Sequence, residues 1–421
     1  MHKGNKFIGV FAAVSMVVGI QPAFAEDVFK LGVIQPQAGE CAQWGVPVTR
    51  ATQLWAEELN EAGGIETKDG KRHKIEVTAY DNGCYAAGEE LKAARRAVLD
   101  DGVKYISQTY TPASRQAIGP LSAEANIMSI AYGAGFLSAK YPLIVGAITG
   151  SPQANMLGMS YLIEKQPDIK RIAILTANVS YGNAAKVYMD AGVAAHADKA
   201  EVVYTSSYDP SAASDMLSLL TPVIEAQPDL IYELGFIPSQ KAVLIATADQ
   251  LGYKGKFASE DWSVPFLKEQ GVMESAAGRI FAIMAVDGSE PTFSPRAHEF
   301  YKRYTAKYGA AEWVSNASMA YSTAAFLEAA VKASPTIDPV DVAKSVYAMS
   351  EVEHPIYGKS QWSGEEIYGV KHQLLTPTPV YGFEADGTVV LDGVIDTHAW
   401  WEKNKAAAIP VIKNGGQAFV E

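Results

Sequence analysis

Apolar positions along the chain follow two periodicities that alternate. Short apolar runs such as Phe29–Ile34 and Ile75–Tyr80 predict strands, while a longer stretch at 46–61 repeats apolar residues at helical spacing. Further strands are predicted at 104–107, 127–130, 171–176, 201–206 and 230–233, and further helices at 86–99, from about 112, and at 181–196, 211–226 and 238–251. Strands that alternate with helices form parallel sheets covered on both faces, so the pattern predicts an α/β fold with two doubly wound parallel-sheet lobes.

Two stretches predict connections between these lobes. Residues 142–151 form a strand-like link after the first series of elements, and residues 277–286 lead out of the second series. After Pro355 the chain is rich in glycine, proline and aromatic residues, which fits strands and loops added to one lobe. We therefore expect one lobe from residues 26–147 and 281–357, and the other from residues 148–280 and 358–421.

The N-terminal segment has the pattern of an export signal. Lys3 and Lys6 precede an apolar run at 7–20, and the small residues of 23–25 form an Ala-x-Ala cleavage site. The run is too short for a good membrane span, although an uncleaved anchor is the alternative. No cysteine follows the run at the cleavage point, so no lipid anchor is expected there. We expect residues 1–25 to be removed after Ala25 and the protein to act in the periplasm.

Composition and charge narrow the range of partners. Apolar residues make up 48% of the chain and charged residues 19%, which is ordinary for a globular protein. The net charge of −12 disfavours nucleic acid or an anionic membrane surface as a partner, because both attract cationic proteins. It says nothing about a small ligand.

The chain has two cysteines, Cys41 and Cys84, in the loops after the first two predicted strands. In an oxidising compartment such a pair favours a disulfide, with two buried, inert thiols as the alternative. No metal-ligand pattern accompanies them, and the seven histidines are scattered.

Motifs of catalysis or cofactor binding are absent from the sequence. There is no phosphate-binding loop, no nucleophile elbow and no zinc-protease motif, and Gly133 and Gly135 are followed by Ser138 where a dinucleotide fingerprint needs glycine. We therefore expect neither an enzyme nor a cofactor. In open α/β sheets ligands bind beyond the carboxyl ends of the strands, so the loops there are the place to look for function.

Those loops carry segments with a familiar order and spacing. They are GVIQPQAGECAQWG at 32–45, NEAGGI at 60–65, YDNGC at 80–84, DDGVKYISQTYTPASRQAIGP at 100–120, RIAILTANVSYGNAA at 171–185 and DLIYELGFIPSQKAVL at 229–244. In these segments the chain resembles periplasmic solute-binding proteins of the branched-chain amino acid (Leu/Ile/Val-binding) type, which serve ABC transporters. The resemblance implies two α/β lobes, joined by three crossovers, that close on a ligand by a hinge.

The resemblance also implies binding residues in the first lobe. The loop that holds a ligand carboxylate in relatives matches 109–114, with Thr109, Thr111 and Ser114 as candidates and Pro112-Ala113 where relatives often have serines. A helix that starts there would point unpaired N–H groups at an anion, although a plain helix cap is the alternative. The next loop matches Gly133, Ala134 and Gly135, which let a ligand approach the main chain or simply form a tight turn.

In the second lobe the resemblance implies an aromatic and an acidic contact. Tyr181 matches an aromatic residue over the ligand, Phe236 stands where relatives often have tyrosine, and Asp261 matches the acid that pairs with an ammonium group. Glu260 is the alternative if the register slips by one, and packing or a solvated carboxylate are the alternatives to contact. Gln43, Trp44 and Trp262 add flat surfaces near the same cleft, whereas Trp55 and Trp313 are interpreted as core.

The implied function is the capture of a small organic ligand for an ABC permease by a monomeric carrier. If Asp261 faces the cleft, an apolar amino acid is favoured; if it turns away, an aromatic or other hydrophobic carboxylate is favoured. Relatives can pair a cysteine at the Cys84 position with one near 109–111, where this chain has none, so the partner must differ. The alternatives are a ligand sensor of similar fold and an exported enzyme that uses Asp81, Glu260 or Asp261.

Overall fold

The computed structural model describes residues 27–84, 87–107, 112–132, 137–209 and 215–416 together with Met1, and for residues 87, 112–117 and 131–132 it describes the backbone alone. The predicted export signal lies outside these residues. No helix within the described ranges is long and apolar enough to cross a membrane.

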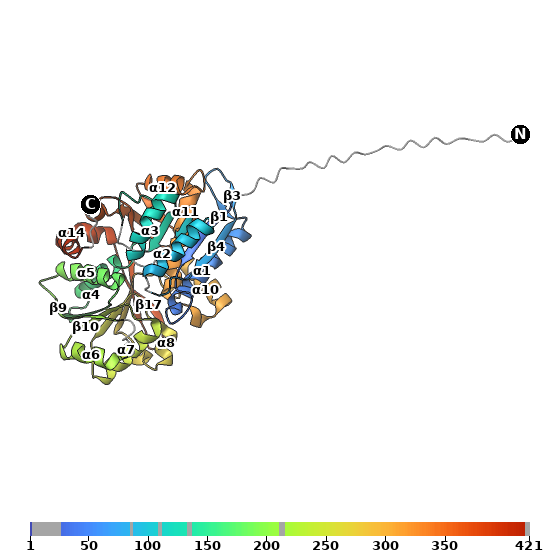
Figure 1. Ribbon diagram of the computed structural model, residues 1–421. Coiled ribbons are helices and arrows are strands. Elements are labelled where there is room, and N and C mark those ends of the chain that lie inside the picture. Colours follow the sequence, from blue (N-terminus) through green and yellow to red (C-terminus); the bar gives the residue numbers. More distant parts are fainter. Residues whose placement is uncertain (2–26, 85–86, 108–111, 133–136, 210–214, 417–421) are drawn as a thin grey trace.

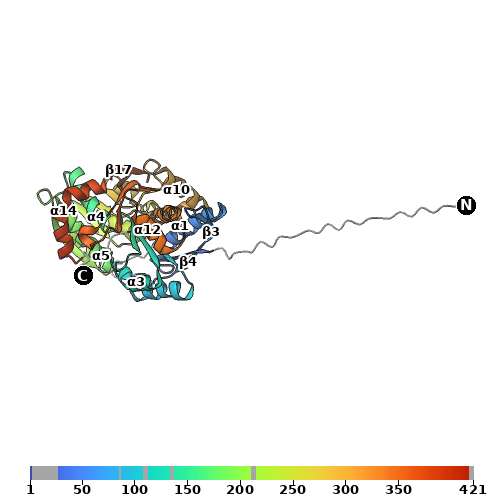
Figure 2. The same ribbon diagram turned by 90° about the horizontal axis from the view of Figure 1, so that it is seen from above.

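Two sheets with their helices form two lobes, as the sequence predicts (Figure 1). The first lobe is built largely from the N-terminal third of the chain and from α10–α12, and the second from the middle of the chain and the C-terminal helix. Seen from above, α14 lies at the end of the molecule opposite β3 (Figure 2).

The first sheet has the strand order β13-β14-β15-β7-β6-β5-β1-β4. Its lobe contains β1 (Phe29–Ile34), α1 (Ala42–Glu61), β2 (Ile65–Glu66), β3 (Arg72–His73), β4 (Ile75–Tyr80), α2 (Ala87–Arg95), a π-helical turn (Arg96–Asp100), β5 (Tyr105–Ser107), α3 (Pro112–Ala125), β6 (Met128–Tyr132), β7 (Ile144–Ile148), α10 (Pro295–Tyr308), a 3-10 turn (Ala310–Glu312), α11 (Ser315–Ala333), α12 (Pro339–Tyr347), β13 (Val352–His354), β14 (Gly358–Ser363), α13 (Glu365–Tyr368) and β15 (Gln373–Leu375). Strands β4, β1, β5, β6 and β7 run parallel.

The second sheet has the strand order β17-β16-β12-β11-β10-β8-β9. Its lobe contains α4 (Gln153–Lys165), β8 (Arg171–Ala177), α5 (Ser180–Ala194), β9 (Glu201–Tyr208), α6 (Met216–Glu225), β10 (Leu230–Leu234), α7 (Pro238–Gln250), β11 (Lys256–Ser259), α8 (Val264–Glu269), α9 (Met273–Ala276), β12 (Ile280–Ile283), β16 (Thr378–Phe383), β17 (Val389–Ile395) and α14 (Thr397–Asn414). From β9 to β12 the strands run parallel, and β16 and β17 add antiparallel strands.

Sheet membership differs from the expected lobe boundaries at two places. Strand β12 pairs with β11 in the second sheet, although the sequence assigned residues from 281 to the first lobe. Strands β14 and β15 join the first sheet next to β7, although the sequence assigned residues from 358 to the second lobe. The described chain therefore crosses between the sheets at 149–152, 284–294 and 376–377.

Two of the crossovers are joined directly by a pair of threonines. The amide of Thr149 donates to Thr376 Oγ1 at 3.0 Å, and the amide of Thr376 donates to Thr149 Oγ1 at 2.7 Å. Both residues are buried. Reciprocal hydrogen bonds of this kind hold the two chain segments in register at the junction of the lobes.

Apolar side chains from both lobes fill the interior. The largest cluster of buried apolar residues extends from β1 and α1 of the first lobe to α4, α5 and α14 of the second. Trp55 and Trp313 belong to this cluster, which confirms their interpretation as core residues. A second cluster lies where the second sheet packs against α6–α9, and it includes Phe236 and Trp262.

Gly182, in the first turn of α5, lies directly against the end of β8. A Cβ atom at this position would overlap the carbonyl oxygen of Ala177, which is backbone and cannot rotate away. We expect Gly182→Ala to lower the free energy of unfolding by about 2 kcal/mol, because the helix must move away from the strand. Urea unfolding would measure this loss. Gly88→Ala is the matched control, since open space surrounds that helical glycine, and an equal effect of both substitutions would contradict the expectation.

Candidate ligand-binding cleft

A cleft of about 520 Å³ lies between the strand-end loops of the two lobes. The first lobe contributes Ala38, Gly39, Glu40, Cys41 and Cys84, and the second contributes Asn178, Val179, Asp209, Gly235, Ile237 and Gln240. These residues follow the carboxyl ends of β1, β4, β8, β9 and β10, which is the position expected of a ligand site in parallel sheets. The charged residues among them, Glu40 and Asp209, are both acidic.

The loop after β10 approaches the cleft through a residue that must be glycine. Gly235 has a φ of +114°, and a Cβ atom there would lie 2.5 Å from the Cβ of Ala177. A backbone with this φ strains any L side chain. Gly235 and Ile237 line the cleft, and the loop leads directly into the first turn of α7.

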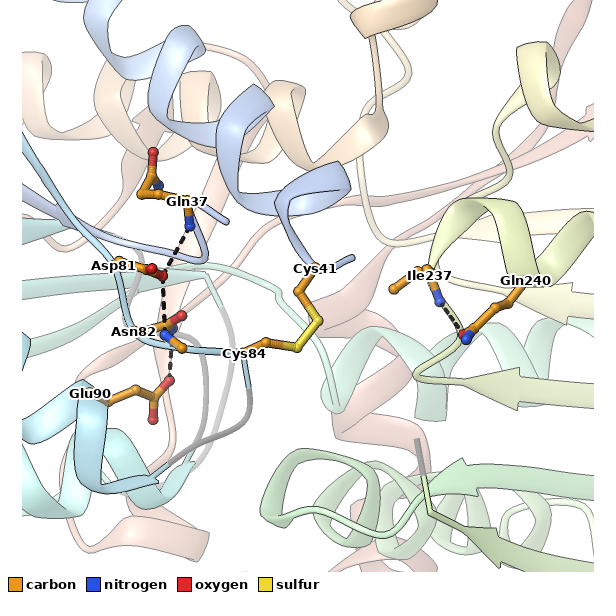
Figure 3. The surroundings of a disulfide bond; sticks show 9 residues. Gln37, Cys41, Asp81, Asn82, Cys84, Glu90, Ile237 and Gln240 are labelled. Carbon is orange, nitrogen blue, oxygen red and sulfur yellow. Dashed lines mark hydrogen bonds between the residues drawn. A yellow bond between two sulfur atoms is a disulfide. The ribbon is translucent and has the colours of Figure 1, made fainter. Parts of the chain in front are cut away.

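The disulfide predicted between Cys41 and Cys84 is present, and it forms part of the cleft wall (Figure 3). It joins the loop after β1 to the loop after β4, and these strands are neighbours in the sheet. Asp81 holds the same two loops together, because its Oδ1 accepts the amides of Gln37 and Gly83, both at 3.1 Å. The rim of the first lobe is thus fixed by a covalent and a polar link.

Gln43 and Trp44 contact the opposite lobe. The Gln43 side chain donates to Ser239 Oγ at 3.2 Å and accepts the Ser239 amide at 3.4 Å, so it spans from the start of α1 to the start of α7. Trp44 is 5% exposed and belongs to a small apolar cluster with Cys41 and Ile237. The lobes therefore meet on the disulfide side of the cleft, where Figure 3 places Ile237 and Gln240 opposite the disulfide.

Tyr181 and Glu260 form a polar group beside the crossover at 149–152. The hydroxyls of Tyr181 and Ser151 lie 2.7 Å apart, and both hydrogen-bond to Glu260 Oε1. Asn155 Nδ2 donates to the same oxygen at 2.8 Å. Among the described residues, all hydrogen bonds to Glu260 go to Oε1, and part of the side chain remains exposed. Burial raises the pKa of the Glu260 carboxyl above its ordinary value, although these donors oppose the shift.

Asp261 turns to the other side of the strand end. It is 7% exposed and forms an ion pair with the buried ammonium of Lys241, in the first turns of α7. Lys241 Nζ also donates to Ser259 Oγ at 2.7 Å and to the Asp261 carbonyl oxygen at 3.0 Å. The acidic side chain that the resemblance places at the ligand is therefore already neutralised in this structure.

Phe236 and Trp262 are buried in the core of the second lobe. The Phe236 ring is fully buried and stacks on Tyr208 with ring centroids 4.2 Å apart. Trp262 donates from Nε1 to the Phe281 carbonyl oxygen at 2.9 Å. The structure thus does not bring these rings together with Trp44 and Tyr181 as one aromatic wall.

The structure describes only some of the remaining sequence-predicted residues. Thr109, Thr111, Gly133, Ala134 and Gly135 lie outside the described residues. Ser114 lies in the first turn of α3, which starts at Pro112 as predicted. Among the described residues there is no group of three or more His, Cys, Asp or Glu that could hold a metal ion.

Comparison with known proteins places this architecture in a family. A family model described as periplasmic binding protein matches residues 28–388. The chain belongs to the periplasmic binding protein family. This family and its fold are those of substrate-binding proteins rather than enzymes.

Relatives and solved structures resemble this periplasmic binding protein over most of its length. A curated relative from Brucella abortus, Leu/Ile/Val-binding protein homolog 8, is 26% identical over 370 residues, which cover 83% of this chain and 87% of the relative. A leucine-binding protein from Thermotoga maritima is 19% identical with a TM-score of 0.69 and covers 88% of this chain and 100% of its own. A Rhodopseudomonas palustris solute-binding protein in complex with 4-hydroxybenzoate is 20% identical with a TM-score of 0.68, with 88% and 96% covered.

Several residues of this periplasmic binding protein that contact Glu260 or the opposite lobe were not singled out from the sequence. Asn155 and Ser151 contact Glu260 from the first crossover and the helix that follows it, and Ser239 and Ile237 contact the first lobe. The start of a helix directly after a short strand was a usable signal for Ile237 and Ser239. Ser151 and Asn155 had no such signal, because they follow a connection between lobes rather than a strand of the second sheet.

Proposed function

We propose that this protein is the solute-binding component of an ABC import system and that its ligand is an amino acid with an apolar side chain. The observation that carries the proposal is the partly exposed Glu260, whose hydrogen bonds from Ser151, Tyr181 and Asn155 all go to one carboxylate oxygen. An ammonium group paired with the second oxygen would complete the site. The Brucella relative named as a Leu/Ile/Val-binding protein homolog supports this ligand class.

In this proposal each lobe supplies one part of the ligand site. Glu260 of the second lobe takes the ammonium, and the start of α3 takes the carboxylate, because helix N-termini favour anions. The resemblance adds Thr109, Thr111 and Ser114 to this part of the proposal. The resemblance assigns residues 133–135 to ligand binding as well, and the apolar part of the ligand would lie toward the cleft rim. The acidic Glu40 and Asp209 of the cleft also favour a ligand that carries a positive group.

Closure of the hinge would bury the ligand, and the closed form would then dock on the permease as a monomer. The bonds between Gln43 and Ser239 join the lobes across the cleft in this structure and would break when the lobes separate. A ligand that contacts both lobes stabilises the closed form by its differential affinity.

A second ligand class is favoured by a different observation. Asp261 is paired with Lys241, so the strand-end loop presents fewer free negative charges than its sequence suggests. An aromatic or other hydrophobic carboxylate would then be accepted if Glu260 were protonated, and the Rhodopseudomonas palustris structure in complex with 4-hydroxybenzoate has a similar fold. The two classes make opposite demands on the charge of Glu260.

The pH dependence of binding separates the two ligand classes. Because burial raises the pKa of Glu260, lowering the pH protonates this carboxyl earlier than an ordinary glutamate. An ammonium ligand needs the ionised form, so its affinity should fall as the pH is lowered from about 8 to about 5. A carboxylate ligand is repelled by the ionised form, so its affinity should rise over the same range.

Isothermal titration calorimetry of the mature chain against leucine, isoleucine, valine, benzoate and 4-hydroxybenzoate at both pH values would measure this. We expect heat with at least one of the three amino acids, with the affinity falling at low pH. Heat with the aromatic acids alone, rising at low pH, would replace the first ligand class by the second. Binding of neither class would overturn the proposed function.

A further inference from the structure

The second lobe contains a buried lysine between two buried carboxylates. Lys241 is 3% exposed and lies near the start of α7, and its Nζ forms ion pairs with Asp261 and, at 3.3 Å, with Glu233 Oε1. Glu233 comes from β10 and is fully buried, whereas Asp261 follows β11. The ammonium thus draws together the carboxyl ends of two neighbouring strands and the helix that lines the cleft.

The contacts of Lys241 with the main chain matter as much as its charge. Its Nζ donates to the Asp261 carbonyl oxygen and to Ser259 Oγ, at 3.0 and 2.7 Å, so it binds the strand-end segment at several points. An ammonium has three donor hydrogens, and Ser259 Oγ, the Asp261 carbonyl oxygen and Asp261 Oδ1 use all of them, while Glu233 Oε1 lies at ion-pair distance. The segment 259–261 is therefore held in one position relative to α7.

The neighbouring acid faces the opposite way as a consequence. Glu260 accepts hydrogen bonds from Ser151, Asn155 and Tyr181, which belong to the first crossover, α4 and α5, while the side chain of Asp261 accepts from Lys241 of α7. The two adjacent acids thus have separate hydrogen-bond partners, while the charge of the Lys241 ammonium acts on both. Without a cation, Asp261 and Glu233 would be buried near each other with no counter-charge, which is strongly unfavourable.

We propose that Lys241 is a built-in counter-ion that withholds Asp261 from the ligand and positions Glu260 as the acid that receives the ligand's ammonium group. This inference rests on the proposed function and names the residue that selects between the two adjacent acids. Lys241 acts through the segment 259–261 and is a positioning residue, since its side chain is buried and the cleft is lined by its neighbours Ile237 and Gln240 instead.

The test compares two variants of the full mature chain, one that replaces Lys241 alone and one that replaces both Lys241 and Asp261. Lys241→Met removes the ammonium and leaves Asp261 without its counter-ion, and we expect the affinity for the amino acid ligand to fall about tenfold and the melting temperature to fall. Lys241→Met/Asp261→Asn removes both charges of the pair. The amide needs no counter-ion and leaves Glu233 as the one buried carboxyl beside the removed ammonium, so we expect this double variant to regain part of the lost affinity and melting temperature.

Lys256→Met is the matched control. This lysine belongs to the same lobe and begins β11, at the end of the strand away from Asp261. Its ion pair is with the exposed Asp168. We expect its affinity and melting temperature to stay within about twofold and a few degrees of the wild type, since surface ion pairs contribute little.

The single variant Asp261→Asn gives the decisive contrast. If Lys241 withholds Asp261, this variant binds the amino acid within about threefold of the wild type, because the ligand does not contact Asp261. If Asp261 itself receives the ammonium, both Asp261→Asn and the double variant lose binding, and the inference is overturned.

Failure of the proposed function can be recognised separately. If the wild-type chain binds none of the amino acids, the melting temperatures still test the counter-ion: Lys241→Met should melt lower than Lys241→Met/Asp261→Asn. Equal melting temperatures of these two variants, together with a fall of both relative to the wild type, would show that Lys241 stabilises the lobe by packing and would overturn the inference.

Discussion

Glu260→Gln is expected to weaken binding of the amino acid ligand about 100-fold, because it removes the only proposed counter-charge of the ligand's ammonium from a partly buried position. The amide keeps the size of the side chain and still accepts hydrogen bonds from Ser151, Tyr181 and Asn155, so the fold of the site is preserved. Calorimetry at neutral pH would measure the loss, and the dependence of affinity on pH should disappear together with the ionisable group.

Glu269→Gln is the matched control for this substitution. Glu269 ends α8 in the same lobe and is exposed, so its replacement removes the same charge without touching the cleft. Unchanged binding by both variants would contradict the role of Glu260. Tighter binding of an aromatic carboxylate by Glu260→Gln would instead favour the second ligand class, because the amide removes the repulsion between two carboxylates.

Removal of the disulfide should cost more stability than any other change considered. Cys41 and Cys84 are separated by 43 positions, and chain entropy predicts a loss of about 4 kcal/mol in the free energy of unfolding when a loop of this size is released. We expect Cys41→Ser/Cys84→Ser to unfold at a lower urea concentration than the wild type. The wild type under a reducing agent should shift to the same midpoint.

The effect on binding should be much smaller, since Asp81 still joins the two loops through the amides of Gln37 and Gly83. We expect the ligand affinity of the double serine variant to fall less than threefold or so, a change of well under 1 kcal/mol. An unchanged urea midpoint would contradict the structural role of the disulfide. A loss of binding as large as that of Glu260→Gln would instead show that the disulfide contributes directly to the ligand site.

The sequence predicted local structure closely where the residues of a single strand or helix are enough to identify that element. Strands at 29–34 and 75–80 have the predicted bounds, and α7 begins at Pro238 as predicted, because proline is favoured in the first turn of a helix. Some boundaries moved by a few residues. Helix α1 begins at Ala42 and contains Pro47 in its first turns, and α6 begins at Met216 after the cap Asp215, whose side chain accepts the Ser218 amide.

Assignment of strands to lobes depended on contacts that no local pattern contains. The sequence predicts a connection between the lobes at 277–286, whereas β12 within this stretch pairs with β11 in the second sheet, where Phe257 faces Ile280. Likewise β14 and β15 lie far along the chain from β7, and Gln373 pairs with Gly146 across that distance. A strand's own residues indicate that it is a strand and leave its neighbour open.

The candidate site shows the same division between local and distant information. The sequence placed Cys41 and Cys84 in neighbouring strand-end loops, and the parallel sheet brings them together. It placed Tyr181 and the acids 260–261 at strand ends of the second lobe, where the structure has them. It did not indicate that Lys241, 20 positions before Asp261, forms an ion pair with that carboxylate. Nor did it indicate that Ser151 and Asn155 donate hydrogen bonds to Glu260.

By itself the sequence determined the fold class, the repeated strand–helix units, the cysteine pair and the family resemblance, because each of these depends on short-range periodicity or on the order of segments. Only the tertiary structure decided which strands share a sheet, that Phe236 and Trp262 are core residues, and that two adjacent acids face opposite partners. The physical reason is that burial and the pairing of charges depend on residues distant in sequence, whereas periodicity belongs to one segment.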